Sequence, residues 1–195
     1  MSRILSADNP IDGSRRRVLR TAVAGGLALS AGTLAPRFAL AASDADARLE
    51  ELGITLPEVP PPVANYVPYV VENGFVYCAG QLAFKDGELM FPGKVPTDVS
   101  VEDAQAAAKQ CAINLIAAAK AGCDGDLGRI RRCVRLQGFV ASANDFDGQS
   151  GVMNGASDFM VEVFGDIGRH TRLALGANVL PLNASVEISG IFAMS

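Results

Sequence analysis

Hydrophobic residues recur beyond residue 43 at two spacings, one typical of β-strands and the other typical of helices. Apolar positions three and four residues apart predict helices over residues 101–122 and 149–164, with a short helix over 44–52. Alternating or short apolar runs predict strands over residues 69–72, 75–78, 81–84, 129–141, 172–180 and 185–194. The predicted order is therefore two or three strands, a helix, a strand, a helix and two strands.

Short polar signals mark where these elements begin and end. Asn73-Gly74 separates two strand-like runs by two residues that accept positive φ, so it predicts a hairpin. Asp86-Gly87 predicts a second turn. Ser100, followed three residues later by Asp103, predicts a capped helix start, and Gly122 predicts the end of that helix.

The lengths and order of these elements predict an α+β fold with a single mixed β-sheet and two helices packed on one face. The proline-rich residues 56–63 are expected to cross the molecule in an extended conformation. No predicted helix remains for the other face of the sheet. We therefore expect other copies of the chain to cover that face.

The uncovered face is expected to carry the charged residues of the last two strands. Side chains alternate between the two faces of a strand. This alternation places Arg172 and Glu187 opposite the apolar residues of their strands, and therefore on the face without helices. Two interpretations stay open: a structural ion pair at a subunit contact, or a guanidinium that binds a small carboxylate through two hydrogen bonds. The apolar set assigned to the core in residues 172–180 is Leu173, Leu175, Ala177 and Val179.

The middle strand, residues 129–141, is expected to alternate in the same way. Val134 and Leu136 are assigned to the core, with Ile130 and Val140, and Cys133 is assigned to the opposite side. The strand's arginines are interpreted as partners of acidic neighbours and not as a track for RNA; they are Arg129, Arg131 and Arg135.

Residues 1–41 have the features of an export signal. Paired arginines in residues 14–20 precede an uncharged run over 21–36, and Ala39-Leu40-Ala41 supplies a small-x-small cleavage pattern. The alternative is a retained membrane anchor, but about 16 residues is short of the roughly 20 that span a bilayer. We predict a twin-arginine signal peptide over 1–41, read by the twin-arginine export machinery, and one domain over 42–195. The mature protein is expected in the periplasm or outside the cell, without stable membrane insertion.

Removal of this signal changes the charge balance of the chain. Six of the 17 basic and two of the 21 acidic residues lie in 1–41, so 11 basic and 19 acidic residues remain, a net charge of −8. Such a surface disfavours sequence-independent binding of nucleic acid. The four cysteines are expected to stay free thiols among apolar neighbours, although an oxidising compartment would permit two disulfides.

Common catalytic signatures are missing from the sequence. It contains no phosphate-binding loop, dinucleotide-binding glycine pattern, GxSxG or HExxH motif, and no CxxC pair that would suggest zinc. The single histidine, His170, is interpreted as a surface-loop residue. Any chemistry is therefore expected to use Arg, Glu, Tyr, backbone groups and water, with no metal and no cofactor.

Six short segments in a fixed order resemble one known family. Their order and spacing are similar to those of the Rid family, also called YjgF-like or endoribonuclease L-PSP-like, and in particular to its longer chorismate-mutase-like branch of putative endoribonucleases. The resemblance extends over about residues 48–195. The segments are Val76-Tyr77-Cys78-Ala79-Gly80-Gln81, Gln137-Gly138-Phe139-Val140, Asn144-Asp145-Phe146, Arg172-Leu173-Ala174-Leu175, Leu180-Pro181 and Val186-Glu187-Ile188.

The resemblance implies a homotrimer with a central β-barrel and ligand clefts between subunits. It also implies hydrolysis of reactive enamines or imines to 2-keto acids and ammonia. By position, Arg172 matches the residue that holds the substrate carboxylate and Glu187 the acidic residue near the attacking water. Tyr66, Gly80 and Asn154 match further substrate-binding positions. Ala79 stands where deaminating members often carry serine, and Ala174 where some carry cysteine.

Two other functions are compatible with the family resemblance. One is a trimeric protein that binds small carboxylates without turnover. The other is a ribonuclease, which the net charge of −8 and the absence of a histidine pair disfavour.

Overall fold

The structure is a computed structural model that describes residues 45–61 and 65–195. The predicted export signal, residues 1–41, lies outside these ranges and stays a prediction. The elements are α1 (Ala45–Glu51), β1 (Tyr69–Glu72), β2 (Phe75–Leu82), β3 (Phe84–Lys85), β4 (Glu88–Leu89), α2 (Val101–Gly122), β5 (Ile130–Ala141), α3 (Gln149–Val152), α4 (Asn154–Phe164), β6 (Thr171–Ala177) and β7 (Val186–Met194). Three 3₁₀ turns join them: η1 (Leu127–Arg129), η2 (Gly165–Gly168) and η3 (Pro181–Asn183).

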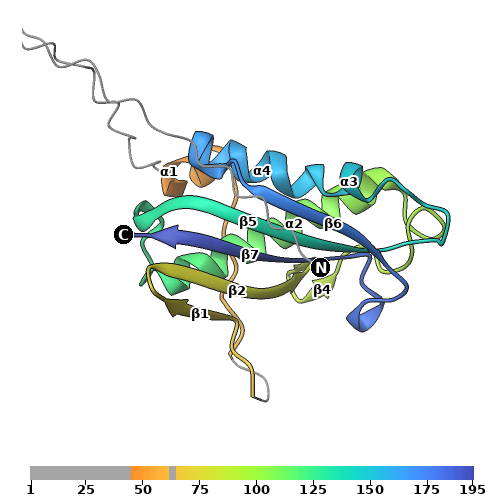
Figure 1. The fold of residues 1–195 in the computed structure, drawn as a ribbon, viewed down its shortest axis with the longest axis horizontal. Coiled ribbons are helices and arrows are strands. Elements are labelled where there is room, and N and C mark those ends of the chain that lie inside the picture. Colours follow the sequence, from red (N-terminus) through yellow and green to blue (C-terminus); the bar gives the residue numbers. More distant parts are fainter. Residues whose placement is uncertain (1–44, 62–64) are drawn as a thin grey trace, which may run out of the picture. The chain divides into compact units, whose positions relative to one another are not determined.

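Five strands form one mixed sheet in the order β1-β2-β7-β5-β6. Within this sheet β5 and β6 run parallel, and the other neighbours are antiparallel. Helices α2, α3 and α4 lie on one face, and no helix of the described residues covers the other (Figure 1). This arrangement confirms the predicted mixed-sheet α+β fold, with the second predicted helix divided at Met153 into α3 and α4.

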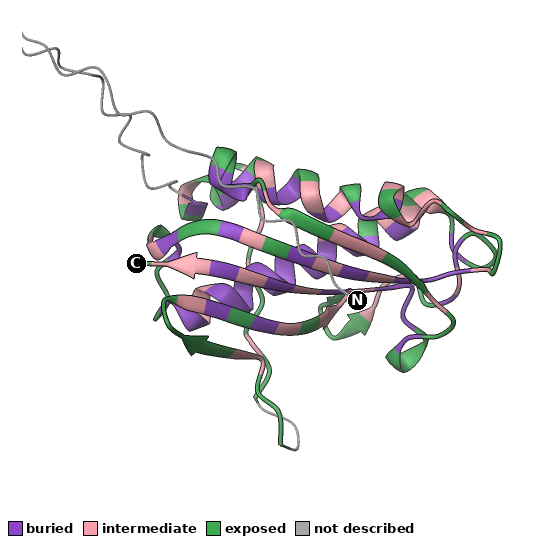
Figure 2. Cartoon of the chain, viewed as in Figure 1, coloured by how far each residue is buried: buried purple, intermediate pink, exposed green. Residues whose placement is uncertain are grey.

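The core lies between the sheet and α2, most of which is buried (Figure 2). The short predicted helix at residues 44–52 is present as α1, and its Ala45 and Leu49 side chains are buried. Lys120 Nζ of α2 pairs with Asp46 Oδ1 of α1 at 2.6 Å. Within residues 45–61 and 65–195, no helix combines the length and apolarity that a bilayer span requires.

Both predicted turns are present. Asn73 and Gly74 join β1 to β2 with φ values of 51° and 78°, as a two-residue hairpin turn with two positive φ values requires. Asp86 and Gly87 join β3 to β4 in the same way, with φ values of 52° and 84°.

Helix α2 begins as predicted but ends for a different reason. The Ser100 Oγ accepts a hydrogen bond from the Asp103 backbone N–H at 3.0 Å. Gly122 is the last helical residue, yet the residues with positive φ are Asp124 and Gly125. A Cβ atom on Gly122 would lie 2.5 Å from Cγ1 of Val76, so this glycine allows α2 to pack closely against β2.

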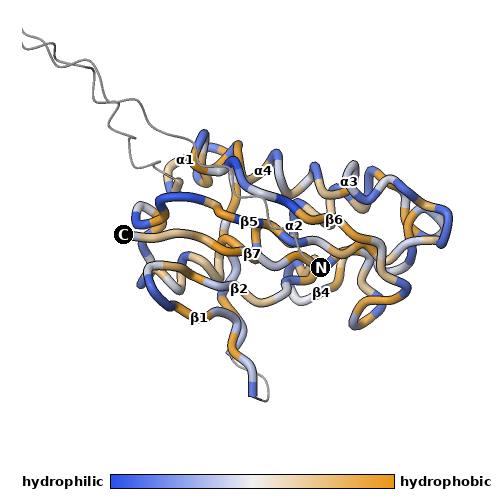
Figure 3. Tube along the Cα trace, viewed as in Figure 1, coloured by the Kyte–Doolittle hydropathy of each residue, from blue (hydrophilic) through white to orange (hydrophobic). Residues whose placement is uncertain are grey.

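The predicted alternation in β5 is wrong near its start. The pairing with β7 shifts register between Cys133 and Arg135, and Cys133 is fully buried whereas Val134 is only partly buried. An extra residue at such a bulge reverses the side on which the following residues lie. Leu136 and Val140 are buried as predicted. The start of β5 carries a hydrophilic stretch (Figure 3).

The face assigned to the residues of β6 is also wrong. In the register with β5, Arg172 lies beside the fully buried Leu136, so it belongs to the helix-covered face. Leu175 lies on the helix-free face, where its side chain is 45% exposed, and Val179, beyond the strand, is 64% exposed. A Cβ on Gly176 would lie 3.0 Å from both Gln149 Nε2 and Ser142 Oγ. The helix-covered face therefore holds the small residues of β6, and the larger apolar ones face away.

The four cysteines are free and buried, as predicted. Burial raises the pKa of Cys78 and Cys133 to about 12, and it also raises the pKa of Cys111 and Cys123. These thiols are therefore protonated and behave as core side chains.

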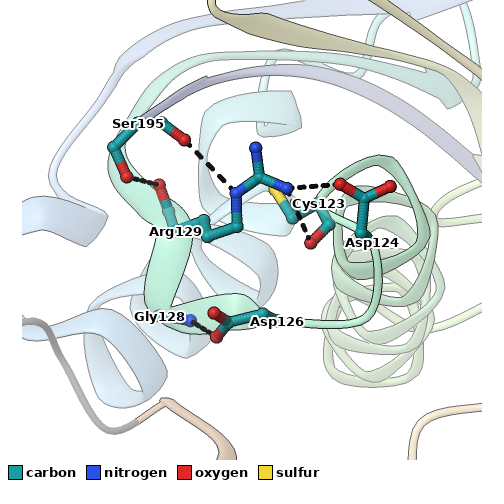
Figure 4. A network of polar contacts seen from close by, with 6 residues as sticks. All are labelled: Cys123, Asp124, Asp126, Gly128, Arg129 and Ser195. Atoms are coloured by element: carbon teal, nitrogen blue, oxygen red, sulfur yellow. Dashed lines mark hydrogen bonds and ion pairs between the residues drawn. The ribbon is translucent and has the colours of Figure 1, made fainter.

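One arginine of the β5 region pairs with an acidic neighbour, as predicted, and two do not. Arg129, in η1, pairs with Asp124 and donates from Nε to the Ser195 backbone oxygen at 3.2 Å (Figure 4). This network fastens the end of β7 to the loop that follows α2. For Arg131 and Arg135 the prediction is wrong, because neither has a carboxylate partner in the described part of the chain.

Candidate functional site

Arg172 projects from the edge strand β6 toward the N-terminal ends of α3 and α4. Its Nη1 donates to Asn154 Oδ1 at 2.9 Å and to Ser157 Oγ at 3.1 Å. Its Nη2 donates to the Ser150 carbonyl oxygen at 3.2 Å. The residue is exposed, and no carboxylate among the described residues pairs with it. The guanidinium is therefore held in place by neutral oxygen atoms and keeps its charge unpaired.

His170 extends this arrangement by one more side chain. Its Nδ1 lies 2.6 Å from the Gly168 carbonyl oxygen, which only accepts, so Nδ1 carries the proton. The Nε2 atom lies 3.0 Å from Ser157 Oγ and therefore accepts the hydroxyl proton when the ring is neutral. Burial lowers the pKa of His170, the Gly168 carbonyl opposes this shift, and the charge of Arg172 adds to it. The ring is thus neutral near pH 7.

Ser157 and His170 were not predicted as site residues from the sequence. His170 does precede β6, but it is half-buried and hydrogen-bonded on both ring nitrogens, which corrects its interpretation as a surface-loop residue. Two spacings could have indicated the cluster. Ser157 lies one helical turn after Asn154, and His170 lies two residues before Arg172 on the same side of the chain.

Glu187 lies on the helix-free face of β7, between the buried residues Val186 and Ile188. The neighbouring strand β2 contains a bulge, where Ala79 and Gly80 lie between the paired residues Cys78 and Gln81. A Cβ on Gly80 would overlap Oε1 of Glu187, so the glycine leaves room for the carboxylate in its present position.

The environment of the Glu187 carboxylate raises its affinity for a proton. Burial raises the pKa of Glu187 above the ordinary value for a glutamate. Among the described residues, no side chain or backbone group forms a hydrogen bond or ion pair with this carboxylate. It is a half-buried base without a partner among residues 45–61 and 65–195.

A pocket of about 590 Å³ lies beside Gly80. The proline-rich segment, the end of β2, the β3–β4 hairpin and η3 surround it, and α2 closes one side. Tyr66, which is 62% exposed, contributes its ring to the wall. The inner wall is fixed by Asn114, which donates to the Leu82 and Phe84 carbonyl oxygens at 2.9 Å each. Most of the remaining wall is apolar and includes Pro57, Pro60, Pro61, Pro68, Leu82 and Leu182.

The predicted site residues thus form two groups within one chain. Arg172 and Asn154 form the first, which we call the arginine half-site, together with Ser157 and His170. Glu187 lies against Gly80, and Gly80 and Tyr66 line the pocket; we call this group the glutamate half-site. The prediction that Arg172 and Glu187 share the helix-free face is wrong, because Arg172 bonds to α3 and α4. No group of three or more His, Cys, Asp or Glu side chains in residues 45–61 and 65–195 could hold a metal ion.

Comparisons with known proteins agree with this fold. Residues 46–194 match the family model described as YjgF/chorismate mutase-like, putative endoribonuclease. The chain is 40% identical over 146 residues to Protein TCP17 of Trypanosoma cruzi, which covers 74% of this chain and 91% of that protein.

Solved structures give the same result. The protein Atu1372 of Agrobacterium tumefaciens, described as having unknown function, is 45% identical with a TM-score of 0.73, over 79% of this chain and 96% of that one. A putative endoribonuclease from Shewanella oneidensis is 31% identical with a TM-score of 0.74, over 77% of this chain and 99% of that one. The chain therefore belongs to the YjgF/chorismate mutase-like, putative endoribonuclease family, as its motifs predicted.

Proposed function

We propose that this protein hydrolyses reactive 2-imino acids, or the enamines from which they form, to 2-keto acids and ammonia. In this proposal the active cleft lies between two copies of the chain, with the arginine half-site from one copy and the glutamate half-site from the next. The observation that carries the proposal is that the guanidinium of Arg172 and the carboxylate of Glu187, which have no ion-pair partner in the described part of the chain, lie on opposite faces of one sheet. A site that contains both groups therefore requires two chains.

The hydrogen bonds of Arg172 favour a carboxylate ligand. Asn154, Ser157 and the Ser150 carbonyl occupy three of its five N–H donors. The two that remain are Nε–H and one N–H of Nη2. These two nitrogens share one edge of the planar guanidinium, and such an edge binds a carboxylate through two parallel hydrogen bonds.

The state of Glu187 suits it to activate water. A carboxylate whose pKa is raised by burial accepts a proton more readily near neutral pH than an ordinary glutamate does. Glu187 takes a proton from water as the water oxygen bonds to the C=N carbon, and it passes this proton to the imine nitrogen to give a carbinolamine. Glu187 then takes the hydroxyl proton of the carbinolamine and gives it to the amino group as the C–N bond breaks, which releases ammonia, forms the C=O bond of the keto acid and leaves the carboxylate ionised.

The helix-free face of the sheet supports an assembly of identical chains. Tyr77 of β2 and Leu175 of β6 leave 43% and 45% of their surface exposed on this face, beside the partly buried Ile191 and Phe139. An apolar surface of this kind marks an interface more often than a solvated face. We propose a homotrimer in which these faces form a central barrel, exported by the twin-arginine route to the periplasm or beyond.

Mixing two inactive variants tests the proposal directly. Arg172→Ala and Glu187→Gln should each reduce ammonia release from freshly generated 2-imino acids at least a hundredfold, whereas Arg131→Ala and Glu88→Gln serve as matched exposed controls. When equal amounts of the two inactive variants are unfolded together and refolded, random assembly in a cyclic trimer rebuilds an intact cleft at about one site in four. Recovery of about a quarter of the parental rate supports a shared cleft. No recovery, or activity in Arg172→Ala alone, refutes it.

A second function, binding of small carboxylates without turnover, is favoured by one residue. Ala79 lacks the hydroxyl that serine provides at the matching position of deaminating members, so one polar contact is missing beside Gly80. Stabilisation of the trimer by 2-keto acids, without any ammonia release from imines, would favour this binding function over hydrolysis.

A further inference from the structure

We infer that His170 is a positioning residue for Arg172, acting through the hydroxyl group of Ser157. The inference rests on the proposed function, since it concerns the guanidinium that would hold the substrate carboxylate. It concerns an interaction that lies wholly within one chain, in the described residues of α4, η2, β6 and the short link between η2 and β6 that holds His170. It rests on three hydrogen bonds, from His170 to Gly168, from Ser157 to His170 and from Arg172 to Ser157. Each of the first two determines which atom donates in the next.

The first contact fixes the imidazole ring. The Gly168 carbonyl oxygen accepts from Nδ1 at 2.6 Å, which sets the ring plane and leaves Nε2 as the acceptor. Gly168 itself cannot shift easily. A Cβ at this position would overlap the Met160 backbone oxygen, so η2 packs directly against α4. The ring is therefore tied to the backbone of the helix that carries Ser157.

The second contact fixes the hydroxyl proton of Ser157. Nε2 of His170 accepts this proton at 3.0 Å, so the lone pairs of Oγ point away from the ring. The third contact uses one of these lone pairs, because Nη1 of Arg172 donates to Oγ at 3.1 Å. Without His170, the hydroxyl loses the acceptor that fixes its rotation, so its lone pair is aimed less firmly at Nη1.

The guanidinium must keep one orientation for its free edge to meet a carboxylate. Asn154 and Ser157 both bind Nη1, and together they set the rotation of the guanidinium plane. Loss of the Ser157 contact leaves the guanidinium held only by Asn154 at Nη1 and by the Ser150 carbonyl at Nη2, so its plane is less firmly fixed. Binding of the substrate carboxylate should then weaken, whereas the chemical step at Glu187 should proceed as before once substrate is bound.

Conservative variants distinguish positioning from a purely structural role. In His170→Gln the amide oxygen can take the place of Nε2 as an acceptor for Ser157, whereas His170→Phe offers a ring of similar size and no acceptor. We expect His170→Phe and Ser157→Ala to raise KM for 2-imino acids, and the Kd of the product analogue 2-oxobutyrate, about five- to tenfold. kcat should stay within about twofold, and His170→Gln should recover most of the loss. Thermal melting of each variant checks that it is folded.

Two further measurements make the inference falsifiable. The double variant, Ser157→Ala with His170→Phe, should bind 2-oxobutyrate no more weakly than either single variant, because both remove the same contact. The imidazole ¹⁵N shifts of the parent should show a protonated Nδ1 and an unprotonated Nε2.

The inference would be overturned if the losses of affinity for 2-oxobutyrate multiplied in the double variant. Equal binding by His170→Phe and the parent, or a protonated Nε2, would also overturn it. A parent that binds 2-oxobutyrate but does not hydrolyse imines refutes the proposed function alone, and the His170 test then proceeds on Kd. A parent that does neither refutes both.

Discussion

Two glycines four residues apart provide a matched test of how closely α4 packs against α2. A Cβ on Gly155, in α4, would overlap the Gln105 backbone oxygen and lie 2.8 Å from its carbonyl carbon. A Cβ on Gly151, in α3, would have no atom within 4 Å. The same substitution, glycine to alanine, should therefore have opposite effects on stability at the two positions.

The cost at Gly155 follows from the nature of the atoms it would meet. Gln105 contributes backbone in the middle of α2, which cannot swing aside as a side chain can. Helix α4 must therefore move by about 1 Å, and close-packed interiors tolerate such shifts poorly. Overpacking of this kind costs about 1–3 kcal/mol, partly offset by about 0.5–1 kcal/mol from replacing a helical glycine with alanine. We expect Gly155→Ala to lose about 1–2 kcal/mol in the free energy of unfolding.

Thermal and urea unfolding at equal protein concentration measure this difference. For a chain of 150–250 residues, 1 kcal/mol corresponds to about 2–4 °C in Tm, so Gly155→Ala should melt about 2–8 °C below the parent. Gly151→Ala should melt at the parental temperature or slightly above it, because alanine restricts the unfolded chain. Equal shifts for both variants, or a Gly155→Ala protein as stable as the parent, would refute the close contact between α4 and α2.

Two further predictions follow from buried ionisable groups. Because burial raises the pKa of Glu187, its ionised form disfavours the folded state above the ordinary glutamate pKa, so Glu187→Gln should be more stable than the parent at pH 7. Urea midpoints should converge as the pH falls toward 4, where the carboxyl becomes protonated in both states, and a gap that widens on acidification would contradict this. Because the pKa of Cys78 and Cys133 is about 12, these thiols in the folded protein at pH 8 should react with a thiol reagent at least about a thousandfold more slowly than free cysteine. All four cysteines should react at once in denaturant, and fast labelling of the native protein would disprove the burial.

The sequence predicted most reliably those features that a few neighbouring residues determine. Asn73-Gly74 and Asp86-Gly87 form the expected turns because their positive φ values are a local requirement. Ser100 caps α2 because its Oγ reaches an N–H only three residues away. The order of helices and strands, and from it the fold, followed from such local signals together with the apolar spacing.

The faces of β5 and β6 depended on contacts that a period of two cannot reveal. The bulge between Cys133 and Arg135 appears only in the pairing of β5 with β7. In β6, alternation separated the residues into two sets correctly, but it could not decide which set faces the helices. The set with the larger apolar residues was assigned to the core, yet a Cβ on Gly176 would lie only 3.0 Å from Gln149 Nε2, so there is little free space on this face. Leu175 was left on the open face, where other subunits of the proposed trimer would cover it.

The charged residues of the candidate site were predicted from the sequence, whereas Ser157 and His170, which support Arg172, were not. Arg172 and Glu187 were first identified by the alternation of side chains in their strands, and matching positions in a family then indicated their roles and added Asn154. Ser157 and His170 act through contacts between elements 13 residues apart in sequence, so their partnership depends on how η2 folds against α4. A lone histidine in a sequence gives no indication of which oxygen it will meet.

The separation of the two half-sites has a physical consequence for the proposed chemistry. If Arg172 and Glu187 met within one chain, they would form an ion pair that occupies the free edge of the guanidinium and lowers the pKa of the carboxylate. Both groups would then be less suited to their proposed roles. Placing them on opposite faces of the sheet keeps the guanidinium edge open and the carboxylate basic while the chain folds. In the proposed cleft, the substrate carboxylate, and not Glu187, would then satisfy the arginine.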